Sequence, residues 1–155
     1  MSPFQGFFSL QNHRDLLSKL QHDLQRLKDS PMDTYAAFDF FVTAEHMLDW
    51  LYPGADNEDQ RKNLRNSVTL LQIVSHIANG SKHFKATAPH HKSVKDTHET
   101  EGVFDSIAFD PTAFDVGELL IELQGKAANE YGDTISADKL ADKVVAFWEK
   151  HMAGP

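Results

Sequence analysis

The sequence predicts a single, mainly α-helical domain with three long helices, a small antiparallel β-hairpin and a closing C-terminal helix. Apolar residues recur every three or four positions over long stretches, as they do along the buried face of a helix. One short apolar run, Glu118–Leu123, lies between glycines and is typical of a β-strand. With 155 residues, of which 41% are hydrophobic and 25% charged, the chain can bury one core.

The first helix is predicted over Ser9–Asp29. Its residues repeat every seven positions in two registers, which together form the seam of a helix that packs against other helices. The repeating residues are Leu10, Leu17, Leu24 and His13, Leu20, Leu27. We interpret the segment as a helix of an intramolecular bundle, and dimerisation with a partner helix is the alternative.

The second helix is predicted from about Pro31 to Tyr52. Ser30 can cap it, Pro31 suits its first position, and Asp33 stands where a capping-box acid would. The helix is dense in aromatic residues, which indicates core, and Pro53-Gly54 stops it.

The third helix, Leu64–Lys85, is the one around which we expect the fold to be organised, with a start near the cap residue Asn57. Its broad apolar face indicates contact with more than one neighbour. Opposite runs a narrow polar stripe: Thr69, Gln72, His76, Asn79 and His83. Gly80 is interpreted either as a helix end or local kink, or as a point where a backbone or ligand approaches closely.

The rest of the chain is predicted as a mobile loop, a hairpin region and a last helix. Residues 86–102 are polar, without hydrophobic periodicity, and include three histidines. Residues 103–135 are the hairpin region, with a loosely alternating run at 103–109 before the strand at 118–123 and a short return strand at Thr134-Ile135. Residues 136–152 form the closing helix, capped by Ser136.

Composition excludes several classes of function. The absence of cysteine excludes disulfides, thiolate metal sites and cysteine nucleophiles. A formal net charge of −8 argues against broad electrostatic capture of DNA or other nucleic acid, although it leaves room for a local basic site. No apolar run is long enough to span a membrane, and no secretory signal is apparent, so we expect a cytoplasmic protein. No phosphate-binding glycine loop or nucleophile motif occurs, and we expect no cofactor.

The segment Ala78-Asn79-Gly80-Ser81-Lys82-His83 resembles the motif of the HEPN superfamily of helical-bundle proteins. Many members are ribonucleases of toxin–antitoxin and phage-defence systems. The family motif is Arg, often followed by Asn, with His five positions after the Arg; here Ala78 stands at the Arg position. The resemblance implies a HEPN-like bundle, a homodimer with a shared cleft, and RNA as a ligand.

The chain also resembles an uncharacterised bacterial group that shares three features with it. These are an NGSKHF helix end at 79–84, a β-hairpin and a closing VVAFWE helix at 144–149. That resemblance brings no known activity.

Two chemical hypotheses follow for these residues. Metal-independent RNA cleavage would use His83 as the base, with Lys82 or Lys85 in place of the missing Arg and Asn79 beside them. A metal site would combine His46 and His76 with a carboxylate between adjacent helices, although no Glu-x-x-His pair supports it. The working hypothesis is a HEPN-like binding module without full catalytic machinery, which acts on a protein partner, on itself as a homodimer or on RNA; a ribonuclease using His83 is the alternative.

Overall fold

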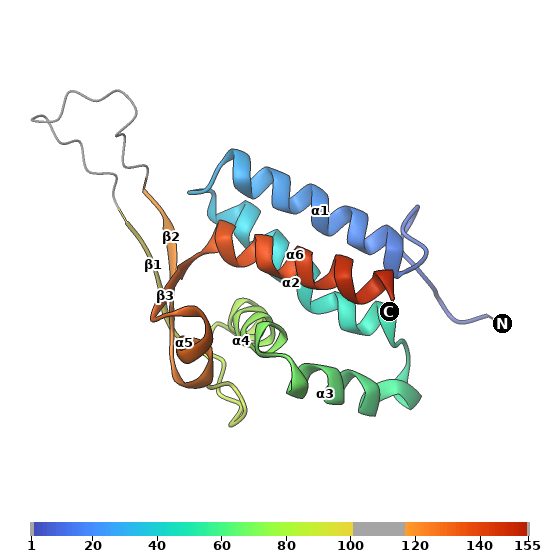
Figure 1. Ribbon diagram of the computed structural model, residues 1–155. Helices are drawn as coiled ribbons and strands as arrows, with labels where there is room; N and C mark the ends of the chain where they lie inside the picture. The colour runs from blue at the N-terminus through green and yellow to red at the C-terminus, as the bar shows by residue number, and fades with distance from the viewer. Residues whose placement is uncertain (1, 101–116, 155) are drawn as a thin grey trace, which may run out of the picture.

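Four helices form the main bundle, and three of them run side by side. A computed structural model describes residues 2–100 and 117–154 (Figure 1). Helix α1 (His13–Asp29) packs along α2 (Thr34–Leu51), and α6 (Ala137–Ala153) lies against both. Helix α4 (Thr69–His83) is seen end-on in Figure 1 and therefore runs across the other three.

The core lies where these four helices meet, and it is made of large apolar side chains that are almost fully buried. They include Leu20, Leu27, Phe40, Met47, Leu48, Leu71, Ile73, Leu140, Val144 and Trp148. These residues come from the apolar faces that were predicted for the three long helices and for the closing helix. The mainly α fold is therefore confirmed.

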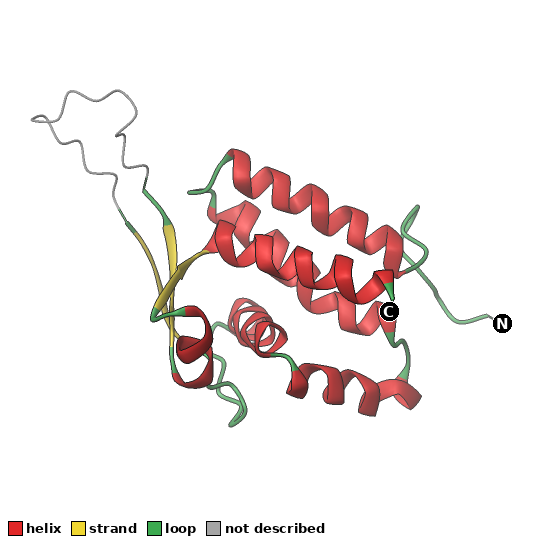
Figure 2. Cartoon of the chain, viewed as in Figure 1, coloured by secondary structure: helices red, strands yellow, loops and turns green. Residues whose placement is uncertain are grey.

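A small three-stranded antiparallel sheet covers one end of the bundle (Figure 2). Its strands are β1 (Val94–Glu99), β2 (Leu119–Leu123) and β3 (Thr134–Ser136), in the order β1-β2-β3. Helix α5 (Gly125–Tyr131) joins β2 to β3. The predicted strand and its return strand are confirmed, because Ile121 pairs with Ile135.

The expectation of a loop throughout 86–102 is wrong, because β1 lies inside that range. Thr97 pairs with Ile121 of β2, and β1 forms the outer edge of the sheet. An edge strand can be polar because only one side of it is hydrogen-bonded and its side chains stay largely exposed. The run predicted at 103–109 lies outside the described residues.

The predicted helix Leu64–Lys85 is also wrong in its extent, because it is two helices. After a short 3-10 turn (η1, Ala55–Asn57), α3 (Glu58–Ser67) ends at Val68, whose backbone is extended. The Gln72 amide donates to the carbonyls of Arg65 and Asn66, at 3.2 and 3.0 Å, and so binds groups that a continuous helix would have used. The break lets the apolar α4 turn across the bundle, while α3 buries no residue.

Gly80 does not end the helix, since α4 continues to His83. A Cβ at Gly80 would meet nothing within 4 Å, so no backbone approaches it closely either. The residue with a positive φ at the helix end is Phe84, at 64°. Within the described ranges, no helix is long and apolar enough to cross a membrane.

Candidate functional site

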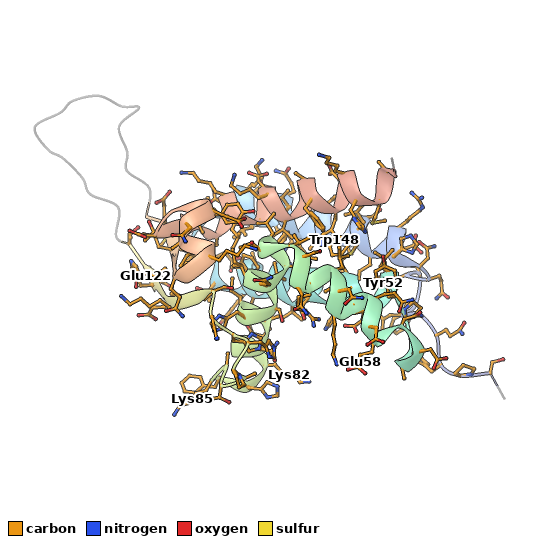
Figure 3. All side chains as sticks on the ribbon, turned by 60° about the horizontal axis from the view of Figure 1, so that its bottom comes forward. Tyr52, Glu58, Lys82, Lys85, Glu122 and Trp148 are labelled. Atoms are coloured by element: carbon orange, nitrogen blue, oxygen red, sulfur yellow. The ribbon has the colours of Figure 1, made fainter. Side chains whose placement is uncertain are left out.

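The candidate site lies in a part of the chain that carries no acidic residue. Residues 60–95 contain seven Lys or Arg and four His but no Asp or Glu, so all 23 acidic residues lie elsewhere. This segment covers most of α3, all of α4, and the connection to β1. Lys82 and Lys85 lie together at one end of the molecule, well away from the buried Trp148 (Figure 3). The chain is acidic overall, yet it has a cationic region.

A hollow of about 540 Å³ lies between the last turn of α4 and the loop that follows it, and we call it the loop-side hollow. It is lined by Asn79, His83, Lys85, Thr87, His91 and two alanines. His83 and Lys85 are exposed, and Asn79 is half-buried. No carboxylate is among these lining residues, so the hollow offers only cationic, neutral and amide groups to a ligand.

A group of histidines that includes His91 lies beside the loop-side hollow. The Nδ1 atom of His76 accepts hydrogen bonds from the backbone N–H groups of Ser93 (3.2 Å) and Val94 (3.0 Å). The ring of His91 stacks on that of His76, with ring centroids 5.0 Å apart. The ring centroid of His90 lies 4.2 Å from that of His91. The start of β1 is thus attached to α4 through a neutral imidazole.

The surroundings of these rings disfavour their protonation. Burial, together with the nearby His90, His76 and Arg65, lowers the pKa of His91 to about 4. Burial, and then His90, also lower the pKa of His76. Both rings are therefore neutral near pH 7, which keeps Nδ1 of His76 available as an acceptor.

A second hollow, of about 400 Å³, lies on the other side of the α4 end, and we call it the α2-side hollow. It is lined by Phe38, Val42, Glu45, His46, Asp49, Ala78, Asn79 and Lys82. Unlike the loop-side hollow, it contains two carboxylates. In the sequence, Glu45 is one of several carboxylates that this helix offers to the hypothesised metal site, and nothing in its local pattern predicts its burial.

Glu45 is unusual because it is mostly buried. Its Oε1 lies 3.1 Å from Nη2 of Arg65, and the two side chains are 17% and 24% exposed. Burial nevertheless raises the pKa of Glu45 to about 7; Arg65 opposes this shift and Asp49 adds to it. Among the described residues, Oε2 of Glu45 and Nε of Arg65 have no hydrogen-bond partner.

The structure separates two of the residues predicted to act together. Lys82 lines the α2-side hollow, whereas His83 lines the loop-side hollow, and only Asn79 lines both. The Nδ2 of Asn79 donates to the carbonyl of Ser75 at 2.9 Å, which leaves its Oδ1 for other partners. The lysine that shares a hollow with His83 is Lys85.

The position of the missing Arg is occupied by a small buried side chain. Ala78 is 8% exposed and lines the α2-side hollow. No arginine is among the residues that line the loop-side hollow with His83. The bidentate phosphate contact that a guanidinium makes is therefore not provided by the residues of this hollow.

The two histidines considered for a metal site have different surroundings. His46 is exposed and lines the α2-side hollow, while His76 accepts a hydrogen bond from the backbone at the start of β1. Within residues 2–100 and 117–154, no group of three or more His, Asp or Glu side chains is placed to hold a metal ion.

Comparisons with known proteins give no relative for this chain: no family model, no curated protein and no solved structure matches it.

Proposed function

We propose that this protein is a HEPN-like, non-catalytic binding module of the cytoplasm that binds single-stranded RNA in the loop-side hollow. One observation carries the proposal: His83, Lys85 and His91 line one hollow within a segment that has no acidic residue. The Lys85 ammonium would supply the sequence-independent part of RNA affinity by contact with phosphate, and the histidine rings would offer hydrogen bonds. The resemblance at Asn79–Phe84 supports RNA as the ligand.

Binding without cleavage is favoured by what surrounds His83. Cleavage at a 2′-hydroxyl needs a positioned base and a fixed cation for the charge that develops on the phosphorane. Lys85 is exposed and flexible by nature, and Ala78 replaces the guanidinium. Such a site can hold a phosphate without stabilising the transition state.

Binding is tested with a fluorescently labelled single-stranded RNA, whose anisotropy is followed at low and at moderate salt. The variant His83→Ala/Lys85→Ala should bind roughly tenfold more weakly and show a smaller salt dependence. Lys62→Ala is the matched control, since Lys62 is an exposed lysine of the same acid-free segment but pairs with Glu58 at 2.8 Å. Equal affinity of the double variant and the control would refute the RNA site.

A ribonuclease that uses His83 is the second candidate, and one observation favours it. His83, Asn79 and Lys85 line the same hollow, so a base, an amide and a cation face one space. Incubation of tRNA with the protein in EDTA, beside His83→Ala, separates the two proposals. Cleavage that disappears in His83→Ala establishes the enzyme, and intact RNA under conditions where it binds establishes the binding module.

We further propose that the module acts as a homodimer, as the HEPN resemblance implies, so that two loop-side hollows serve one RNA. Two linked sites bind with higher avidity than one, because the second contact is intramolecular. Size-exclusion chromatography with light scattering should give twice the chain mass of 17.5 kDa. A monomer at all concentrations used for RNA binding would remove the dimer from the proposal.

A further inference from the structure

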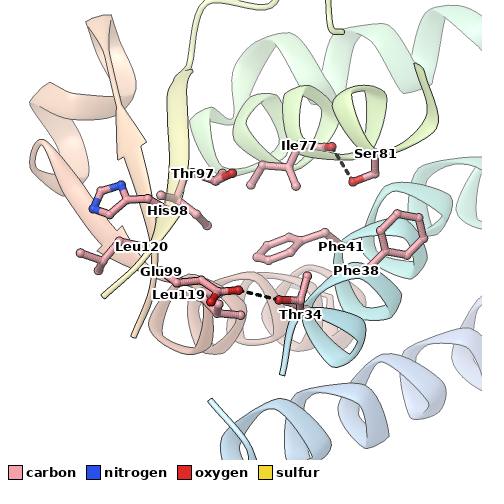
Figure 4. A pocket seen from close by; sticks show the side chains of 13 residues that line it. Thr34, Phe38, Phe41, Ile77, Ser81, Thr97, His98, Glu99, Leu119 and Leu120 are labelled. Carbon is pink, nitrogen blue, oxygen red and sulfur yellow. Dashed lines mark hydrogen bonds between the residues drawn. The ribbon is translucent and has the colours of Figure 1, made fainter. Parts of the chain in front are cut away.

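A separate pocket lies between the sheet and the helices, on a side of α4 that the proposed RNA site does not use. It has a volume of about 300 Å³, at the lower end of the range for small-molecule sites. Its walls come from α2, α4 and both β1 and β2, and the side chains on them include Phe41, Ile77, Leu119 and Ile121 (Figure 4). The lining is mainly apolar.

The strand register explains which side chains face this pocket. Thr97 pairs with Ile121, and Glu99 pairs with Leu119, so these four residues share one face of the sheet. His98 and Leu120 also line the pocket, but they belong to the other face of the sheet and their side chains point away from the pocket centre (Figure 4). The sheet therefore presents two apolar side chains, one hydroxyl and one carboxylate to the space.

Among the described residues that line the pocket, Glu99 is the one carboxylate, and none of them is a lysine or arginine. The hydroxyl of Thr34 on α2 donates to its Oε1 at 3.2 Å, which holds the carboxylate at the rim (Figure 4). Among the described residues, no Lys, Arg or His nitrogen forms an ion pair with Glu99. A negative charge thus stands at the edge of an apolar space without a cationic partner from the described chain.

The other polar groups of the pocket are weaker attachment points. The Ser81 hydroxyl already donates to the carbonyl of Ile77 at 3.0 Å. Ligand pockets typically combine apolar walls with a few polar groups that fix the orientation of the ligand, and here the charged one is Glu99.

We propose that this pocket binds a small aryl-alkyl amine, whose apolar ring packs against Phe41 and Ile77 and whose ammonium group pairs with Glu99. Charge complementarity selects the amine, because a carboxylate in the same position would face Glu99 and be repelled. The volume of the pocket limits the apolar part to about one ring system. This inference stands independently of RNA binding.

The test uses phenethylamine as the probe and the full chain labelled with ¹⁵N. Titration to millimolar concentrations should shift the amide resonances of Ile77, Thr97 and Ile121 in a saturable way. The anion 3-phenylpropanoate, which has the same ring and nearly the same length, should leave them in place. Glu99→Gln should weaken phenethylamine binding about three- to tenfold, as expected for loss of a partly exposed charged contact.

Glu122→Gln is the matched control, because Glu122 is a glutamate of the same sheet that pairs with Lys95 and His98 on the opposite face. It should bind phenethylamine like the unaltered protein. The proposal is overturned by absence of saturable shifts, by equal binding of the anion, or by equal effects of Glu99→Gln and Glu122→Gln. Because Glu99 is exposed, its substitution should leave the fold intact, which the undisturbed remainder of the spectrum would verify.

Discussion

The two hollows beside the last turn of α4 differ in charge although they share a side chain. Asn79 lines both. The α2-side hollow contains the carboxylates Glu45 and Asp49, whereas no acidic residue lines the loop-side hollow. Lys82 and His83 follow one another in the chain and yet face these opposite surroundings. A motif read along the sequence therefore does not define one site here.

The difference extends to protonation. On the α2 side, burial raises the pKa of a carboxyl to about 7, and on the loop side it lowers the pKa of an imidazole to about 4. Burial disfavours the charged form in both cases, but the two groups are of opposite charge type. The two sides of α4 should consequently respond to pH with opposite signs, and the following predictions test this.

The largest effect is expected when Arg65 is replaced by methionine. The substitution leaves the mostly buried Glu45 without its partner, which should cost about 3 kcal/mol of unfolding free energy at pH 8. At pH 5.5 the loss should be smaller, because Glu45 can then be neutral. Urea unfolding at both pH values measures this, and the double variant Glu45→Gln/Arg65→Met should recover part of the stability. Equal losses at the two pH values would show that Glu45 stays charged.

A smaller effect is expected for Glu45→Gln, and it concerns the pH dependence of stability. The folded pKa of Glu45, about 7, lies above its ordinary value of 4.5. Its stabilising contribution is therefore fully present below pH 4.5 and is lost as the pH rises through 7. Acidification from pH 7.5 to 5 should gain about 2 kcal/mol from this group alone. The Glu45→Gln variant lacks this gain. In urea unfolding, its stability should therefore fall more steeply on acidification than that of the unaltered protein.

The loop-side counterpart is His91→Phe, which keeps a ring beside His76. The folded pKa of His91, about 4, lies below its ordinary value of 6.5, so its contribution is present above pH 6.5 and is lost as the pH falls towards 4. Because solvent screens much of the charge on this ring, the loss of unfolding free energy at pH 5 should be only about 1 kcal/mol. His91→Phe should flatten the acid limb of the stability profile. An unchanged profile, or a His91 pKa near 6.5 by NMR titration, would contradict the assigned environment.

The smallest effect is expected from exchanging single lysines across α4. Lys85→Ala should weaken RNA binding about threefold, because its ammonium faces the hollow without carboxylates. Lys82→Ala should change the affinity by less than about twofold, since Glu45 and Asp49 line the same hollow and repel phosphate. Anisotropy titrations of the two variants side by side provide the measurement. Equal effects would mean that the RNA spans both hollows.

The sequence predicted the helices better than their ends. Periodicity identified α1 and α6, since each has one buried face, and the capping signal and aromatic density identified α2. Helix α1 begins after its cap Asn12 rather than at Ser9, and the cap of α2 is Asp33 rather than Ser30; each cap side chain accepts two backbone N–H groups. Several residues near each helix start can cap, and only the packed structure selects one.

The missed features depend on contacts between distant segments. Strand β1 exists because it pairs with β2, about twenty residues away, and its own polar sequence gives no signal. The environment of Glu45 depends on Arg65, which reaches α2 from α3. By contrast, the separation of Lys82 from His83 was predictable, because successive residues of an α-helix point about 100° apart. The acid-free segment was also visible in the sequence as a charge count.

The interruption at Val68 has a consequence for how the protein opens. Helix α3 contributes no buried side chain, and arginines tie it to α2: Arg65 to Glu45 and Arg61 to Asp49. Because Val68 breaks the backbone ladder between α3 and α4, fraying need not propagate from one to the other. The amide hydrogens of α3 should therefore exchange with solvent long before those of α4, because α3 can unfold locally while the core remains folded.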